Sequence, residues 1–204
     1  MRAKQFLLAA LLVATACSRS LITEQDGQGG VFSMKGASRG YFHGRAEIGQ
    51  LWTGGGVLLC RSTPDVVARI VSIEPVEVTG DVTVDAIHVR TSLRPGPEGD
   101  LNPNKYFVNG AGSAPANARQ PAGYLVPTAC RGGPGTKVGE VMTTMTKTGA
   151  AGGMLQGLRV TYLWGWQLHE FVIPWTFGLC GTATQEHCGP GVGGSTSIPA
   201  ISPA

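Results

Sequence analysis

The sequence has few charged residues and, after its first residues, no long apolar run. Charged side chains make up 14% of the 204 residues, and the formal net charge is +3. It falls to +1 if Arg2 and Lys4 leave with the leader described below. A nucleic-acid binder needs clustered basic residues for phosphate contacts, so we expect no nucleic-acid partner. A membrane-spanning helix needs about 20 apolar residues, and no window after the leader approaches that length.

Helical periodicity is also missing. No window after the leader keeps apolar residues at i, i+3, i+4 and i+7, so long amphipathic helices are not expected. The chain instead contains 31 Gly and 13 Pro. This composition favours many short elements joined by turns.

Catalytic motifs are absent from the sequence. It contains no Gly-x-Ser-x-Gly elbow, His-Glu-x-x-His helix or phosphate-binding Gly-x-x-x-x-Gly-Lys-Ser/Thr loop. The Gly-x-Ser within residues 110–118 lacks the preceding apolar strand and the closing Gly of a nucleophile elbow. We therefore predict a protein that is not an enzyme and needs no cofactor.

The histidines do not form a metal motif either. No two of the four histidines have the close spacing of metal ligands. They are His43, His88, His169 and His187. We interpret His88 and His169 as residues on polar strand faces and His187 as a loop residue. A zinc site using His187 and Cys188 is the alternative, and we predict no metal.

Residues 1–16 have the pattern of an export signal. Arg2 and Lys4 form a basic region, a short apolar run follows, and residues 14–16 are small. Cys17 comes next, as a lipoprotein signal requires, so cleavage before Cys17 would leave an N-terminal cysteine that carries a diacylglycerol. Residues 14–16 also suit ordinary signal peptidase, so free secretion is the alternative. The sequence predicts an exported protein, either lipid-anchored at the outer face of the cell membrane or secreted.

Five cysteines are present, at positions 17, 60, 130, 180 and 188. With Cys17 set aside, the other four suggest two disulfides in an oxidising compartment. The first and last strands of an immunoglobulin-like sandwich commonly run side by side, which favours Cys60 with Cys180 and leaves Cys130 for Cys188. The rival arrangement pairs Cys180 with Cys188 and Cys60 with Cys130.

Six segments alternate or cluster apolar residues as strands do. They are residues 56–60, 65–78, 81–91, 137–148, 155–164 and 168–180. Because no helical crossover joins them, the sequence predicts an all-β fold, specifically an antiparallel immunoglobulin-like β-sandwich.

Turn residues and prolines add detail to this fold. Three short connections predict antiparallel hairpins, at residues 79–81, 149–153 and 164–166. Pro75 and Pro174 interrupt their segments, so each is expected at an edge, a bulge or a switch between sheets. The alternation slips near Ile87, which predicts a β-bulge.

The chain divides into segments of different composition. After the signal peptide, residues 17–48 show no sustained period and are interpreted as a lipid-anchored flexible tether, partly ordered from about residue 40, where it approaches the body. Residues 49–188 are the predicted sandwich domain, and residues 92–124 form a long loop within it, rich in Pro and Asn. Residues 189–204 are of low complexity and are predicted to be a disordered tail.

Aromatic residues gather near the end of the domain. Alternation places Phe171, Ile173 and Trp175 on one face, which is typical of a core stripe. Trp164 and Trp166 lie in a turn, where burial is less expected, and they are the candidate binding surface for an envelope protein or a glycan.

The strands resemble an uncharacterised family of secreted or lipid-anchored actinobacterial proteins with a β-sandwich body. The resemblance covers roughly residues 49–181 and rests on residues 56–60, 67–90, 157–162 and 171–180. It implies the strand order above and an extracytoplasmic location, and it transfers no catalytic residue. We expect a non-enzymatic binding or accessory module of the cell envelope. A secreted hydrolase or hydrolase inhibitor that uses the 92–124 loop is the alternative.

Overall fold

The computed structural model describes six stretches of the chain: residues 21–23, 32–33, 41–61, 67–93, 109–127 and 135–181. The predicted signal peptide and tail lie outside these residues, and so do Cys17, Cys130 and Cys188. No helix occurs in the described stretches, and strands dominate them. The all-β prediction is confirmed.

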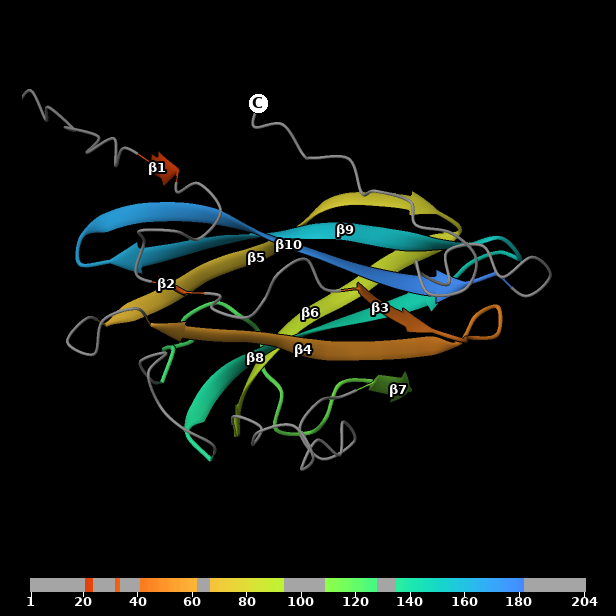
Figure 1. Ribbon diagram of the computed structural model, residues 1–204, viewed down its shortest axis with the longest axis horizontal. Helices are drawn as coiled ribbons and strands as arrows, with labels where there is room; N and C mark the ends of the chain where they lie inside the picture. Colours follow the sequence, from red (N-terminus) through yellow and green to blue (C-terminus); the bar gives the residue numbers. More distant parts are fainter. Residues whose placement is uncertain are drawn as a thin grey trace, which may run out of the picture.

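The strands form two five-stranded sheets that pack face to face (Figure 1). The first sheet has the order β1 (Leu21–Thr23), β10 (Gln167–Cys180), β9 (Gly152–Trp164) and β5 (Ala68–Gly80), with β3 (Tyr41–Gly44) also paired to β10. The second has the order β2 (Phe32–Ser33), β4 (Leu51–Arg61), β8 (Lys137–Lys147) and β6 (Val82–Leu93), with β7 (Asn109–Ala111) beside β4. The six predicted segments correspond to β4, β5, β6, β8, β9 and β10.

Apolar side chains from both sheets meet in one core. The second sheet contributes Val57, Leu59, Val89 and Val141 and the first contributes Ile70, Leu158, Val160 and Ile173, all fully buried. Burial alternates along β9 and β10 because successive side chains point to opposite faces of a sheet. The predicted core stripe is confirmed, since Phe171 and Ile173 are buried and Trp175 packs against the core.

Two of the three predicted hairpins are instead connections between the sheets. Residues 79–81 join β5 of the first sheet to β6 of the second, and residues 149–153 join β8 to β9 in the same way. These hairpin predictions are wrong because the strands on either side of each turn pair with other strands. The third, at residues 164–166, joins the paired strands β9 and β10 and is confirmed.

The predicted irregularities lie close to their expected places. Pro75 is in β5, at the edge of the first sheet. Pro174 lies where the register of β10 shifts, between Ile173 and Thr176. The register of β6 shifts between Val84 and Ala86, just before Ile87.

Parts of the predicted tether belong to the folded body. β1 and β3 pair in parallel with β10, and β2 pairs with β4. The interpretation of residues 17–48 as a tether is therefore wrong at β1 and β2, while β3 lies in the stretch expected to be partly ordered, and the body begins before Gly49. Strands of two to four residues are too short to show an alternation in the sequence.

Cys60 and Cys180 lie at opposite ends of the body. Cys60 is near the end of β4, beside the start of β8, and Cys180 ends β10, beside the start of β9. Since β8 ends only a few residues before β9 begins, these two places are separated by the length of a strand, roughly 30 Å. A disulfide needs Cα atoms within about 7 Å. The favoured pairing of Cys60 with Cys180 is therefore wrong: the long strand β4 runs opposite to β10, and it is β3 that lies beside and parallel to β10 (Figure 1).

This geometry predicts the outcome of disulfide mapping. Digestion of the oxidised protein should give no linked peptide pair that contains Cys60 and Cys180, because the body would have to unfold to join them. Mass spectrometry of non-reduced peptides measures this directly. Recovery of a Cys60–Cys180 peptide from folded protein would contradict the strand directions.

Candidate functional site

The hairpin between β9 and β10 presents the tryptophans that the sequence singles out. Trp164 pairs with Gln167, so Gly165 and Trp166 form a two-residue turn. Gly165 has a φ of 59°, which is the left-handed conformation that such turns require and that glycine adopts without strain. Trp166 at the tip is 85% exposed, and Trp164 is 39% exposed.

Other apolar side chains are exposed at the same end of the two sheets. Of the eight exposed large hydrophobic residues in the described part of the chain, five lie here, and we call them the tryptophan end: Val67, Leu93, Leu125, Trp164 and Trp166. Val67 precedes Ala68, the partner of Trp164, and Leu125 lies opposite Arg69. Exposed apolar residues gathered at one end of a fold make that end a candidate interaction surface.

A buried aromatic cluster supports the hairpin. The Tyr162 ring stacks on His169, with 5.2 Å between ring centroids, and Trp164 lies 5.3 Å from the same imidazole. Phe171 meets Tyr162 edge-on at 6.0 Å. These contacts fix the base of the hairpin, so Trp166 projects from a rigid support.

His169 does not lie on a polar strand face, as the sequence suggested. It is 4% exposed, because the register of β9 and β10 places it opposite Tyr162, on the face that contributes to the core. His88 is half-buried on β6. The backbone of His43 belongs to β3, and His187 lies outside the described residues.

Residues 119–126 connect the edges of the two sheets beside the tryptophan end. Arg119 exchanges two backbone hydrogen bonds with Val89 of β6, at 2.9 Å each. Further along, the Ile70 N–H of β5 donates to the Tyr124 carbonyl, also at 2.9 Å. The segment therefore closes the gap between the edge strands β5 and β6 and holds Leu125 in place.

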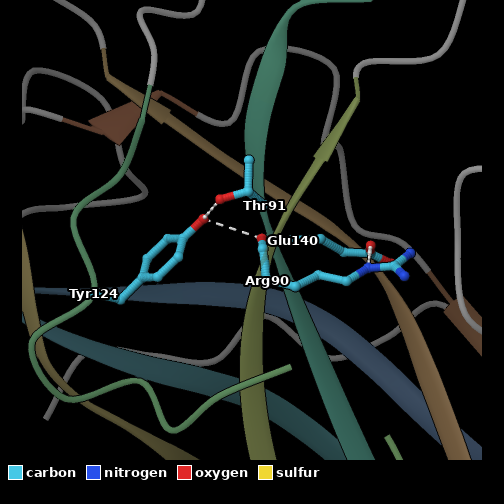
Figure 2. A network of polar contacts seen from close by, with 4 residues as sticks. All are labelled: Arg90, Thr91, Tyr124 and Glu140. Atoms are coloured by element: carbon cyan, nitrogen blue, oxygen red, sulfur yellow. Dashed lines mark hydrogen bonds and ion pairs between the residues drawn. The ribbon is translucent and has the colours of Figure 1, made fainter. Parts of the chain in front are cut away.

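A hydroxyl network fixes this segment to β6 (Figure 2). The Tyr124 hydroxyl donates to the Arg90 carbonyl at 3.0 Å and lies 3.1 Å from the Thr91 hydroxyl. The Arg119 guanidinium covers the Tyr124 ring, 4.9 Å from its centroid. Burial raises the pKa of the Tyr124 hydroxyl above its ordinary value of 10.0, although the Thr91 hydrogen bond and the Arg119 charge oppose the shift.

An ion pair lies beside this network. The Arg90 Nε donates to Glu140 Oε2 at 2.6 Å, and the Glu140 side chain is fully buried while that of Arg90 is 16% exposed. Gly55 of β4 faces the carboxylate, and a Cβ at that position would collide with Glu140 Oε1. The ion pair joins the central strand β8 to the edge strand β6, and its place in the sheet suggests a structural role.

Part of the tryptophan end could be predicted from the sequence. Trp164 and Trp166 follow from the turn chemistry. Val67, Leu93 and Leu125 were missed because strand register and the return of a long insertion bring them to the hairpin. The short apolar stretch 124–126 after a Pro- and Gly-rich segment is the one signal that could have identified Leu125.

Comparison with known proteins gives no match: no family model, no curated protein and no solved structure is similar to this chain. Within the described ranges, no group of three or more His, Cys, Asp or Glu residues could hold a metal ion. The same part of the chain contains no helix long and apolar enough to cross a membrane.

The ion pair yields a prediction about stability. Arg90→Met leaves the buried Glu140 carboxylate without the guanidinium and should lower the free energy of unfolding by about 3 kcal/mol. Glu140→Gln should lower the free energy of unfolding by a smaller amount, since the Arg90 charge, which loses the carboxylate, is partly exposed to water. Urea denaturation measures both.

The matched control for this pair is Arg159→Met. Arg159 lies 3.5 Å from Glu170, and its side chain is 46% exposed, so its loss should cost about 0.5 kcal/mol or less. A cost for Arg90→Met no greater than that of the control would show that the buried pair does not stabilise the fold.

Tyr124 yields a prediction about pH. At neutral pH, Tyr124→Phe should cost about 1 kcal/mol through the lost hydrogen bonds. Because the folded pKa is raised, the unfolded chain loses the hydroxyl proton first, so the Tyr124 contribution declines as the pH rises above 10 through the folded pKa. The stability difference between the native protein and the variant should therefore shrink in that range. Unfolding curves at increasing pH measure it, and a constant difference would contradict the burial of this hydroxyl.

Proposed function

We propose that the protein is a non-enzymatic binding or accessory module of the cell envelope, held at the outer face of the membrane by a diacylglycerol on Cys17. Its contact surface is the tryptophan end. The observation that carries the binding role is Trp166, which is 85% exposed at the tip of a rigid hairpin. A large aromatic side chain held in water by a fixed turn is typical of a recognition surface.

The body is proposed to be an immunoglobulin-like sandwich, and the strand order supports this. In that fold, strands A, B, E and D form one sheet and C, F and G the other. The order β2-β4-β8-β6 follows A-B-E-D, and the order β5-β9-β10 follows C-F-G. Such sandwiches serve many functions, so the exposed site and not the fold supports the binding role.

The cysteines are proposed to pair as Cys60 with Cys130 and Cys180 with Cys188. Cys60 and Cys180 are disulfide-bonded cysteines and not free thiols, and they lie at opposite ends of the body. Cys130 shortly precedes β8, whose start is beside Cys60, and Cys188 follows Cys180 by eight positions. Disulfides persist in oxidising compartments, which supports an exported protein.

The alternative of a hydrolase or hydrolase inhibitor gains no support from the insertion at 92–124. Its described part, from residue 109 on, is hydrogen-bonded to β4, β5 and β6. A lid or a reactive loop needs freedom to move. These bonds instead make the part described from residue 109 on a fixed part of the body.

The proposed anchor predicts the form of the mature N-terminus. Mass spectrometry of protein purified from cells should show a chain that begins at Cys17 with a diacylglycerol on its sulfur. Cys17→Ser should move the protein from the membrane fraction to the soluble fraction, and Cys60→Ser is a control that keeps the anchoring residue. An unmodified Cys17, or a mature chain that starts elsewhere, would indicate free secretion.

A further inference from the structure

We infer that the tryptophan end docks on the membrane itself, with Trp166 inserted into the interfacial region of an anionic bilayer. The inference rests on the proposed function for the anchor at Cys17. It adds the partner of the exposed surface and the orientation of the body on the membrane. The position of β1, the side-chain chemistry of the hairpin end and the distribution of charge support it.

The position of β1 places Leu21, its first residue, toward the tryptophan end. Leu21 pairs with Leu168, which comes two positions after Trp166, and β1 runs parallel to β10. The first residue of β1 therefore lies toward the hairpin side, and the strand runs away from it (Figure 1). Cys17 precedes Leu21 by four positions, and four residues span at most about 14 Å. An acyl anchor at Cys17 would hold the hairpin within reach of the membrane surface.

The side chains of this end suit the interface between lipid and water. Tryptophan is enriched at the level of the headgroups, where its ring is buried and its N–H stays in contact with water. Further exposed apolar residues lie at the same end as Trp166, such as Val67 and Leu125, which are 66% and 47% exposed. A saccharide site would combine the aromatic ring with polar side chains that bind hydroxyl groups. Apolar residues next to exposed basic ones, such as Val67 and Leu125 with Arg69, instead match the chemistry of the lipid interface.

The charged side chains are distributed along the body as docking on an anionic surface requires, with basic residues at the hairpin end and most acids toward the other end. The cations within two positions of the strand ends on the hairpin side are Arg61, Arg69 and Lys137. The nearest described acids, Glu140 and Glu170, lie a few positions farther along their strands, and each forms an ion pair, with Arg90 and Arg159. Acids gather toward the opposite end, at Glu47, Glu77, Asp81 and Asp85, and they outnumber the cations there, which are Arg45 and the buried Lys147. Basic residues near an anionic leaflet are attracted to it, and acids are repelled. This asymmetry favours docking with the hairpin toward the lipid.

The experiment measures which tryptophan meets lipid. The mature protein is mixed with phosphatidylcholine vesicles, with or without phosphatidylglycerol, that contain lipids brominated near the headgroup. Bromine quenches tryptophan fluorescence at short range, so the protein should be quenched more strongly when phosphatidylglycerol is present. Trp166→Phe should abolish most of the quenching. Trp175→Phe, which alters a tryptophan packed against the core, should leave it unchanged.

A pair of charge variants tests the orientation. Arg69→Gln should reduce the docked population about fivefold in anionic vesicles, the effect of one basic residue near the surface. Arg45→Gln removes an exposed arginine on the opposite side, before β4, and should have no effect. Equal effects of the two variants would overturn the proposed orientation.

The outcomes separate this inference from the proposed anchor. An acylated Cys17 without quenching of Trp166 would overturn the membrane contact and leave the anchor standing. Quenching of Trp166 with an unmodified Cys17 would support the contact and remove the anchor. If soluble cell-wall glycan fragments change the Trp166 fluorescence and vesicles do not, the surface binds saccharide and the inference is wrong.

Discussion

Burial of two apolar sheet faces against each other is the constraint on which the rest of the structure depends. Each long strand contributes alternate side chains to the shared core, and this fixes which residues face outward. Packing two sheets also leaves a gap between their edge strands β5 and β6. Residues 119–126 fill it, with the Tyr124 hydroxyl bonded to β6 and the Tyr124 carbonyl bonded to β5. The surface beside the hairpin takes its shape from this closure.

The strands could be predicted from the sequence because alternation is a local property. Pairing is not local, which explains the errors. Residues 79–81 look like a hairpin turn, but a turn of the same length can lead a strand into the opposite sheet. The prediction that Cys60 lies beside Cys180 was wrong for a related reason. It assumed that the strand of Cys60 lies next to β10, whereas β3 lies there, and β3 is too short to be recognised in the sequence.

The candidate site, too, could be predicted from the sequence only where local features determine it. Trp166 could be identified because a glycine beside it marks a tight turn, and turn tips are exposed. Leu125 could not, because its place depends on a bridge to Arg69, which is more than fifty positions away in the chain. His169 was assigned to the wrong face because the sequence does not reveal that the stacked ring of Tyr162 lies opposite. Local chemistry thus predicts the tip of the surface, and register determines its extent.

Pro75 has a consequence for how copies of this chain meet one another. It lies in the edge strand β5, in a part that residues 119–126 do not cover, and it has no N–H to offer to an added strand. Exposed Glu74 and Glu77 flank it, so two such edges would repel each other. An open sheet edge otherwise invites a neighbouring chain to extend it. For molecules held on a membrane by the proposed anchor, and so concentrated in two dimensions, this edge would favour separate molecules over a continuous sheet.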